Sequence, residues 1–426
     1  MSTYKSDLSG IYKLSISERQ KLISRLTELD EREKSILKDF GYFSSTKLNT
    51  MIENVIGSYQ LPLGIATNFK INEKDYLIPM VIEEPSVVAA ASKAAKIARK
   101  NGGFTTEEVK PVMISQIQIT KLKDIKIAKE LILRNKSEIL KIANQQDPIL
   151  TKLNGGAIDI EVRELSTFRG PMLILHLLVN VLDAMGANIV NTMAEAVAPY
   201  VEELCGGKVY LRIVSNLATQ RIAKCTAIFD KDLLGGSHVV DGILDAYAFA
   251  KTDPYRAATH NKGIMNGIVA LTLATGNDTR AIESGAHTFA ALEGKYKPLS
   301  DFEINEEGNL VGKLEMPLAL GIIGGMTKVH PMARISLKIL GVKSSAELSQ
   351  VAISLGLAQN VAALRALVSE GIQKGHMALH ARNIAKLANV PDNLIEKVTS
   401  IMIEDEIFRL DHAKNILKRL QKGENL

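Results

Sequence analysis

Two segments of the chain have residues of the types and spacing that proton and anion chemistry requires. The segment THNKGIMNG places Lys262 among hydrogen-bond donors and glycines at the mouth of an apolar helix. A cation there can meet a carboxylate or a developing oxyanion. The later segment GNDTR places Asp278 in a tight turn. Asp278 could pair with Lys262, or it could cap a helix while Lys262 stays solvated, and the residues alone leave both possibilities open.

Further titratable groups have equally plausible structural explanations. Glu83 and Glu84 precede Pro85, and acidic residues in the first turn of a helix are favoured by its dipole. His376 follows Gly375 within a helical pattern, and a lone histidine is more often a structural residue than a catalytic one. Each of these residues is therefore a candidate for proton transfer, but none is decisive by itself.

One strand-to-helix turn has the features of an anion site. The chain contains neither GxGxxG after a strand nor GxxxxGK[ST], which excludes the Rossmann and P-loop fingerprints. The turn DAMGAN nonetheless follows a very apolar strand, and its Gly186 permits close approach of the backbone. The helix that follows would offer unpaired N–H groups to a phosphate. An ordinary strand–turn–helix junction is the alternative.

The metal-ligating residue types are scattered. His376 and His380 share a helix face, but no acidic third ligand accompanies them, and no histidine or cysteine has zinc-site spacing. Cys205 and Cys225 provide neither a disulfide framework nor a CxxC motif. The sequence predicts no metal site.

The elements that must position these residues indicate an α+β protein with an insertion. A helix is expected near the N-terminus, begun by a capping box at Ser17 and Gln20. Alternating strands and helices with short turns fill residues 111–218, whereas the chain after them is mostly helical. We predict four parts: residues 1–110, the inserted domain 111–218, residues 219–376 and a helical segment 377–426.

Composition excludes several classes of protein. Hydrophobic residues make up 46% and charged residues 23%, which is typical of globular domains. A net charge of +5 over 426 residues and an aromatic content of 5% do not favour nucleic-acid binding. We see no signal peptide and no apolar run of the roughly 18 residues that a membrane span needs. The sequence predicts a soluble, cytoplasmic protein.

Taken together, the motifs closely resemble 3-hydroxy-3-methylglutaryl-coenzyme A (HMG-CoA) reductases of class II, the soluble type of bacteria and archaea. In order along the chain they are ENVIG, EEPS, DAMGAN, THNKGIMNG, GNDTR and GHMALHARN. The resemblance spans about residues 10 to 420. It implies a large, helix-rich substrate-binding domain and an inserted, small α+β domain for the dinucleotide. That small domain is expected to be ferredoxin-like rather than a Rossmann fold, and residues 377–426 are expected to form a C-terminal lid.

The resemblance assigns four catalytic roles. The family reduces the thioester of HMG-CoA to mevalonate and coenzyme A with two hydrides from NAD(P)H. Lys262 would stabilise the oxyanion, and Asp278 would hold Lys262. His376 would protonate the departing thiolate, and Glu84 would protonate the alkoxide formed from mevaldehyde.

The resemblance also implies binding residues. Arg256 is the expected partner of the free carboxylate of the HMG moiety, and Lys13 of the coenzyme A phosphates. The other substrate-binding residues are Glu53, Ser86, Asn216 and Asn266. The expected dinucleotide-binding residues are Asp147, Asp183, Met185, Gly186 and Asn188. An acid at position 147 would repel a 2′-phosphate, which favours NADH over NADPH.

The family further implies a homodimer with active sites at the subunit interface, and often a trimer of dimers. Two alternatives to biosynthetic reduction were weighed. The same site could run oxidatively, degrading mevalonate with NAD⁺ and coenzyme A, and the residues would be identical. A catalytically inactive coenzyme A or nucleotide-binding subunit would lack at least one of four residues that are all present: Glu84, Lys262, Asp278 and His376.

Overall fold

The N-terminal residues form a small helical unit. The structure is a computed structural model that describes the chain except residues 1–10, 27–28, 370–380, 423 and 425–426. It divides into two compact units, Met1–Pro62 and Leu63–Leu426. The first contains the 3₁₀-helix Ile11–Lys13 and the helices α1 (Ile16–Leu26), α2 (Glu31–Lys38) and α3 (Ser45–Asn49). Helix α1 begins two residues earlier than predicted, because the reciprocal hydrogen bonds of its capping box join Ser15 and Glu18 rather than Ser17 and Gln20.

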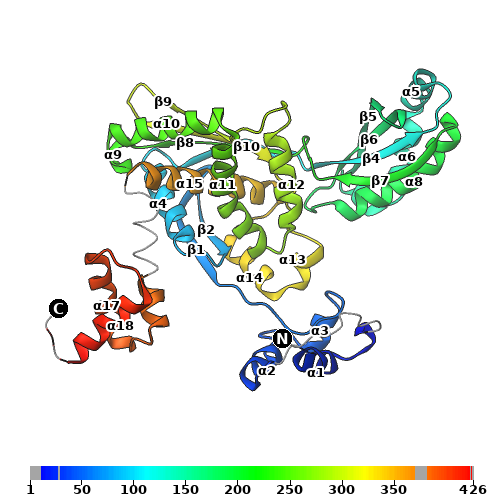
Figure 1. Ribbon diagram of the computed structural model, residues 1–426. Coiled ribbons are helices and arrows are strands. Elements are labelled where there is room, and N and C mark those ends of the chain that lie inside the picture. The colour runs from blue at the N-terminus through cyan, green and yellow to red at the C-terminus, as the bar shows by residue number, and fades with distance from the viewer. Residues whose placement is uncertain (1–10, 27–28, 370–380, 423, 425–426) are drawn as a thin grey trace. The chain divides into compact units, whose positions relative to one another are not determined.

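The second unit is built on a six-stranded mixed sheet, visible in Figure 1 with helices α4, α11 and α15. Its strands are, in spatial order, β2 (Lys74–Val81), β1 (Leu63–Ile71), β3 (Phe104–Thr106), β8 (Ile222–Phe229), β10 (Leu310–Pro317) and β9 (Ser300–Ile304). Its helices are α4 (Val87–Arg99), α9 (Lys231–Leu234), α10 (Ser237–Thr252), α11 (Pro254–Ala274), α12 (Thr279–Ala290), α13 (Gly325–Val329), α14 (Pro331–Leu340) and α15 (Ser345–Val368). Strands β9 and β10 pair antiparallel and form a hairpin after α12.

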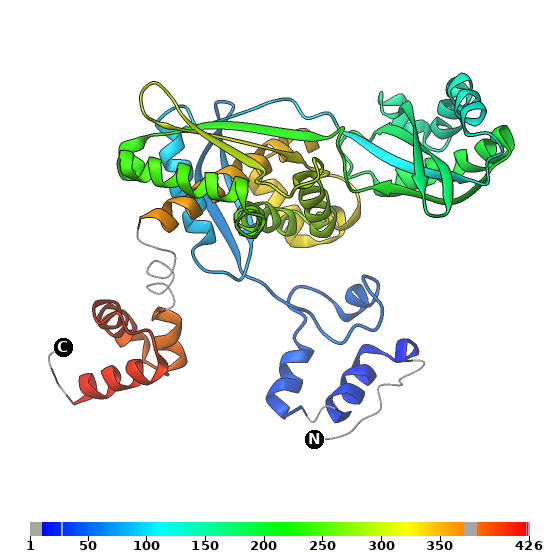
Figure 2. The same ribbon diagram turned by 45° about the horizontal axis from the view of Figure 1, so that its top comes forward.

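A four-stranded antiparallel sheet lies between β3 and β8 in the sequence. Its strands are, in spatial order, β5 (Gly156–Thr167), β6 (Gly170–Asn180), β4 (Val112–Thr120) and β7 (Lys208–Ser215). Its helices are α5 (Ile125–Arg134), α6 (Lys136–Asn144), α7 (Pro148–Lys152) and α8 (Ala187–Cys205). The βαββαβ order and this strand arrangement are those of a ferredoxin-like fold, as predicted. Figures 1 and 2 show α5, α6 and α8 gathered with this sheet.

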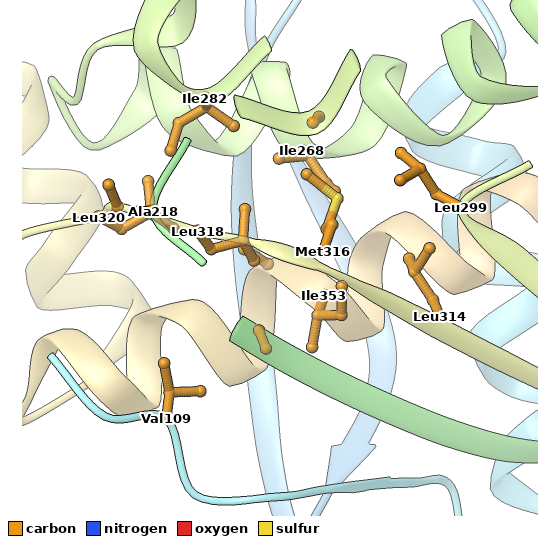
Figure 3. Packing of buried hydrophobic residues seen from close by; sticks show 14 of the residues in the cluster. Val109, Ala218, Ile268, Ile282, Leu299, Leu314, Met316, Leu318, Leu320 and Ile353 are labelled. Carbon is orange, nitrogen blue, oxygen red and sulfur yellow. The ribbon is translucent and has the colours of Figure 1, made fainter. Parts of the chain in front are cut away.

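The core of the second unit contains two long helices, α11 and α15, that pack against each other. Figure 3 shows Ile268 of α11, Met316 of β10 and Ile353 of α15 close together in this core. Gly356 allows the close approach, because a Cβ there would lie 2.7 Å from Cδ1 of Ile268. The contact holds α11 at a fixed depth, so the polar residues at its N-terminal half have a rigid base.

Helix α15 begins where the sequence predicts, with the hydroxyl of Ser344 accepting a hydrogen bond from the Glu347 backbone N–H. By length and composition alone, this helix could cross a membrane. However, 67% of its most apolar window is buried inside the protein, as in the core helix of a globular domain. It is the one such helix among the residues that the structure describes.

The C-terminal helices have an apolar core of their own. Helices α17 (Asp392–Glu404) and α18 (Leu410–Gln421) confirm the predicted amphipathic pair. Val398 and Met402 of α17 pack in the same cluster as Ala413 and Ile416 of α18. The predicted limits of the four parts of the chain stay a prediction.

Candidate active site

An ion pair joins two of the predicted catalytic residues. Glu84 lies in the loop between β2 and α4, and Lys262 lies in the middle of α11, 178 residues further along the chain. The Lys262 Nζ donates to Glu84 Oε2 at 3.0 Å. The two side chains are 60% and 34% exposed, and ion pairs so accessible to solvent contribute little to stability. The fold therefore brings a cation and an acid together without needing them for its own stability.

The residues directly before Lys262 hold its helix in place. Asn261 Nδ2 donates to the Lys297 carbonyl at 2.9 Å, and its Oδ1 accepts from the Leu299 N–H at 3.0 Å. His260 Nε2 lies 2.7 Å from the hydroxyl of Ser300. Both side chains are buried, so the motif fixes the backbone of α11 at the point from which Lys262 projects.

His260 makes the stability of this region depend on pH. Burial, and secondarily the nearby cation of Arg256, lowers the pKa of His260 to about 4. In the unfolded chain, His260 therefore binds a proton near its ordinary pKa of about 6.5. In the folded protein it stays neutral until the pH falls to about 4. We expect the free energy of unfolding to fall as pH falls from about 6.5 to about 4, by up to about 3 kcal/mol.

Chemical denaturation of the wild type and of His260→Gln across this pH range checks the prediction. The glutamine variant should lose this part of the pH dependence. Equal slopes in the two proteins would show that His260 does not titrate as its burial requires.

Ser86 is held in an unfavourable backbone conformation at the start of α4. Its φ of 77° and ψ of −24° lie in the left-handed region, which costs a non-glycine residue about 1–2 kcal/mol. Its Oγ is buried and has no hydrogen-bond partner among the residues that the structure describes. Strain and an unpartnered hydroxyl at one residue are typical of a ligand-binding position.

Arg256 offers a cation without a protein anion. It lies in the first turn of α11, it is half-buried, and none of the described residues forms an ion pair with it. Burial lowers the pKa of its guanidinium, since desolvation disfavours the charged form. A planar, partly desolvated guanidinium is suited to bind a carboxylate with two parallel hydrogen bonds.

These residues line one cavity of about 490 Å³ between α4, α11 and α15. Of the predicted site residues, it contains Glu84, Ser86, Arg256, Lys262 and Asn266. Small side chains of α4 and apolar side chains of α15 form the remaining walls. The cavity therefore joins an acid–cation pair, an anion-binding arginine and an apolar channel.

Two further lining residues were not predicted. Gln359 of α15 is 4% exposed, and its Oε1 is buried without a hydrogen-bond partner. The motif LAQN within an otherwise apolar helix was the available signal. Lys93 of α4 is exposed at the cavity and adds a second lysine to it.

Of the two possibilities that the residues left open for Asp278, the structure shows the helix cap. Its Oδ1 accepts from the backbone N–H groups of Arg280 and Ala281 at 3.0 and 3.2 Å, so it caps α12, and its Oδ2 pairs with Arg280 Nη2 at 3.2 Å. Burial alone would raise the pKa of Asp278, but the Arg280 hydrogen bond and the two N–H groups together lower it. The predicted contact with Lys262 is not formed in this structure, because nearer donors occupy the carboxylate. The catalytic role of Asp278 stays a prediction.

The DAMGAN turn needs a glycine at position 186 because the turn packs directly on Val181. Gly186 has a φ of 98°, and a Cβ there would lie 2.5 Å from a methyl group of Val181. One carboxylate oxygen of Asp183 already has a hydrogen-bond partner, because Oδ1 accepts from the Ser345 N–H at 2.7 Å. Asn188 is exposed in the first turn of α8, and the carbonyl of Met185 lies 3.4 Å from a guanidinium nitrogen of Arg221.

The other predicted residues are placed as follows. Asp147 caps α7 by accepting from the N–H groups of Ile149 and Leu150 at 3.1 and 2.9 Å. Asn216 is exposed after β7 and does not line the described cavity. Lys13 and Glu53 are exposed in the N-terminal unit, and His376 lies outside the described residues.

The sequence matches a family model over most of its length. The model describes hydroxymethylglutaryl-coenzyme A reductase and matches residues 15–381. The chain belongs to the HMG-CoA reductase family. It is therefore an NAD(P)H-dependent oxidoreductase, and it resembles class II members in sequence and fold.

Relatives of this HMG-CoA reductase cover nearly the whole chain. The HMG-CoA reductase of Archaeoglobus fulgidus is 58% identical over 416 residues, which are 98% of this chain and 95% of that protein. A probable HMG-CoA reductase of Borreliella burgdorferi is 37% identical, with 97% of each chain covered. The class II enzyme of Streptococcus pneumoniae, solved with NADPH in open conformations, superposes with a TM-score of 0.76 at 39% identity. That match covers 96% of this chain and 100% of the other.

The described part of the chain contains no cluster of metal-ligating side chains. There, no group of three or more histidine, cysteine, aspartate or glutamate side chains is arranged to hold a metal ion.

Proposed function

We propose that this cavity interconverts (S)-HMG-CoA and (R)-mevalonate plus coenzyme A, acting in the mevalonate and isoprenoid pathway. The observation that carries the proposal is the pairing of Lys262 with Glu84 at 3.0 Å beside Arg256, which forms no ion pair with any of the described residues. HMG-CoA has a thioester at one end of its HMG moiety and a free carboxylate at the other, so it can interact with the Lys262–Glu84 pair and with Arg256 at the same time. The carboxylate would bind Arg256, and the reacting carbonyl would lie at Lys262.

The chain's own residues supply charge and protons for the two reductions. A nicotinamide dinucleotide bound at the DAMGAN turn would supply the two hydrides. Lys262 stabilises negative charge on the carbonyl oxygen in both steps. His376 protonates the coenzyme A thiolate after the first step, and Glu84 protonates the oxygen of mevaldehyde during the second. Asp278 supports Lys262, and the lid of residues 377–426 excludes water.

Ser86, Gln359 and Asn266 complete the binding of the HMG moiety. The buried Ser86 Oγ and Gln359 Oε1 lack partners, and a ligand hydroxyl or carboxylate would satisfy them. Asn216, Glu53 and Lys13 are further expected substrate contacts, the last of them to coenzyme A phosphates. We expect these contacts to form in a homodimer with interface active sites, and class II enzymes often assemble such dimers into a trimer of dimers.

The decisive experiment mixes purified protein with HMG-CoA and either NADH or NADPH and follows the absorbance of the reduced dinucleotide. Oxidation of two dinucleotides per HMG-CoA, with release of free thiol, is expected. A folded protein that oxidises neither dinucleotide would refute the proposal. The reverse direction, with mevalonate, coenzyme A and NAD⁺, is the alternative physiological role, and comparison of the two rates with the genes adjacent to this one would decide between them.

Replacing Arg256 with methionine tests the carboxylate contact. We expect kcat/KM for HMG-CoA to fall roughly 10–100-fold, mainly through KM, because a charge-assisted hydrogen bond contributes about 1.5–3 kcal/mol. Arg256→Lys should recover only part of the loss, since lysine lacks the planar fork. Steady-state kinetics provide the measurement, with KM for the dinucleotide as internal control. An unchanged KM for HMG-CoA would place the carboxylate elsewhere.

We propose NADH as the favoured cofactor, because Asp147 would repel a 2′-phosphate. The S. pneumoniae relative was solved with NADPH, so the preference needs its own test. Asp147→Asn removes the charge but keeps a good helix cap. We expect kcat/KM for NADPH to rise about tenfold in this variant, equivalent to about 1.4 kcal/mol of lost repulsion. A wild type that prefers NADPH, or a variant with an unchanged ratio, would refute the role of Asp147.

A further inference from the structure

The GNDTR turn is attached to a residue far along the chain, Gly321. Asn277, directly before Asp278, donates from Nδ2 to the Gly321 carbonyl at 3.0 Å, and its Oδ1 accepts from the Gly321 N–H at 2.8 Å. The side chain is half-buried. Two opposed hydrogen bonds to one residue fix both the distance and the orientation of the turn that carries Asp278.

Gly321 in turn packs directly on the DAMGAN turn. A Cβ at Gly321 would lie 2.4 Å from the Met185 nitrogen and 2.9 Å from the Ala184 carbonyl carbon, so only glycine permits the contact. The next residue strengthens it, because the Ile322 N–H donates to the Asp183 carbonyl at 2.9 Å. Ala184 also forms a parallel β-bridge with Ile323.

The guanidinium of Arg221 donates hydrogen bonds to both segments of this contact, the DAMGAN turn and Leu320. Arg221 is fully buried, and its Nη1 donates to the carbonyls of Ala184 and Met185 at 3.1 and 3.4 Å. Its Nη2 donates to the carbonyl of Leu320. A buried cation is costly unless hydrogen-bonded, and these three carbonyls accept from both terminal nitrogens, whereas the buried Nε has no partner among the described residues. The mechanism described above gives Arg221 no chemical task.

We infer that Asn277 and Arg221 are positioning residues that fasten the Asp278 turn and the dinucleotide-binding turn to one shared segment, Leu320–Gly321. The inference rests on the proposed function. Through this clamp the dinucleotide-binding turn would be held at a fixed separation from Asp278, the proposed support of Lys262, and a misplacement of about 1 Å can cost about 10²-fold in rate.

Asn277→Ala in the full-length protein is the first test. We expect the single-turnover rate of hydride transfer to mevaldehyde, at saturating reduced dinucleotide, to fall about 10–100-fold. The dissociation constant of the dinucleotide, from its fluorescence, should change less than about threefold. A variant that merely folds less well would lose amplitude and keep the rate. An unchanged rate, or a loss confined to amplitude or to dinucleotide affinity, would overturn the inference for Asn277.

Asn72→Ala is the matched control. Asn72 also hydrogen-bonds across to another segment, with its Oδ1 accepting from the Thr106 N–H at 2.9 Å, but it lies in the β1–β2 turn. The Asn72→Ala variant should leave the hydride-transfer rate unchanged. A fall in this rate equal to that of Asn277→Ala would overturn the inference.

Arg221→Lys and Arg221→Met test the second half of the clamp. Lysine keeps the charge and can reach some of the carbonyls, so it should retain at least about tenfold more of the rate than methionine. Equal rates in two folded variants would overturn the role of Arg221; if neither folds, Asn277→Ala decides. A wild type that oxidises no dinucleotide would instead refute the proposed function, which separates the two failures.

Discussion

Lys262→Met is expected to lower kcat for HMG-CoA reduction by about 10²–10³-fold, the usual cost of removing one group that stabilises an oxyanion. Methionine keeps much of the length of lysine and removes the charge. The Lys262 side chain is 60% exposed, and its one ion pair among the described residues is with Glu84, so the variant should remain folded. Steady-state kinetics with HMG-CoA and with mevaldehyde, together with thermal unfolding, measure the two effects separately.

Lys96→Met is the matched control. Lys96 lies on α4, it is exposed, and it does not line the described cavity. The Lys96→Met variant also removes one positive charge from this region. If the loss in Lys262→Met does not come from the change in net charge alone, Lys96→Met should keep kcat within about twofold of the wild type. If Lys262→Met retains wild-type kcat, or if both variants lose activity equally, Lys262 does not stabilise the oxyanion.

The architecture could be predicted where local pattern and connectivity suffice. The alternation of apolar residues in β4, the nearly continuous apolar run of β6 and the short turns around them indicate an α+β insertion, and its βαββαβ order is ferredoxin-like in the structure. The start of α15 followed from a single capping serine, Ser344. The start of α1 was missed because Ser15 and Ser17 both fit the cap pattern, and only the hydrogen bonds distinguish them.

The site could be predicted through motifs rather than through contacts. Five predicted residues line one cavity although they come from segments far apart in the sequence. The Lys262–Asp278 contact is not formed, and the carboxylate of Asp278 is bound instead by the N–H groups of Arg280 and Ala281 and by the side chain of Arg280. Short-range partners such as these compete well for a carboxylate. Gln359 and Arg221 were missed because their importance depends on which backbone groups surround them, and that is set only by the tertiary packing.

Glu84→Gln is expected to lower the rate of mevaldehyde reduction by about 10²–10⁴-fold, the range for loss of a general acid. Glutamine keeps the shape of the side chain and can still accept a hydrogen bond from Lys262, so positioning is retained and only the transferable proton is lost. The rate of mevaldehyde reduction at saturating dinucleotide, measured against pH, is the direct readout. The dissociation constants of both ligands should change little.

The neighbouring Glu83 provides the control for this prediction. It is exposed and does not line the described cavity, so Glu83→Gln should leave the rate unchanged. Because Glu84 and Lys262 are in contact, their effects should not be independent: in the double variant the combined loss should be smaller than the product of the single losses. Strictly multiplicative losses would mean that the two groups act on different steps or at different oxygens. A fully active Glu84→Gln would move the proton donor elsewhere, and the 3.0 Å contact would then serve only to orient Lys262.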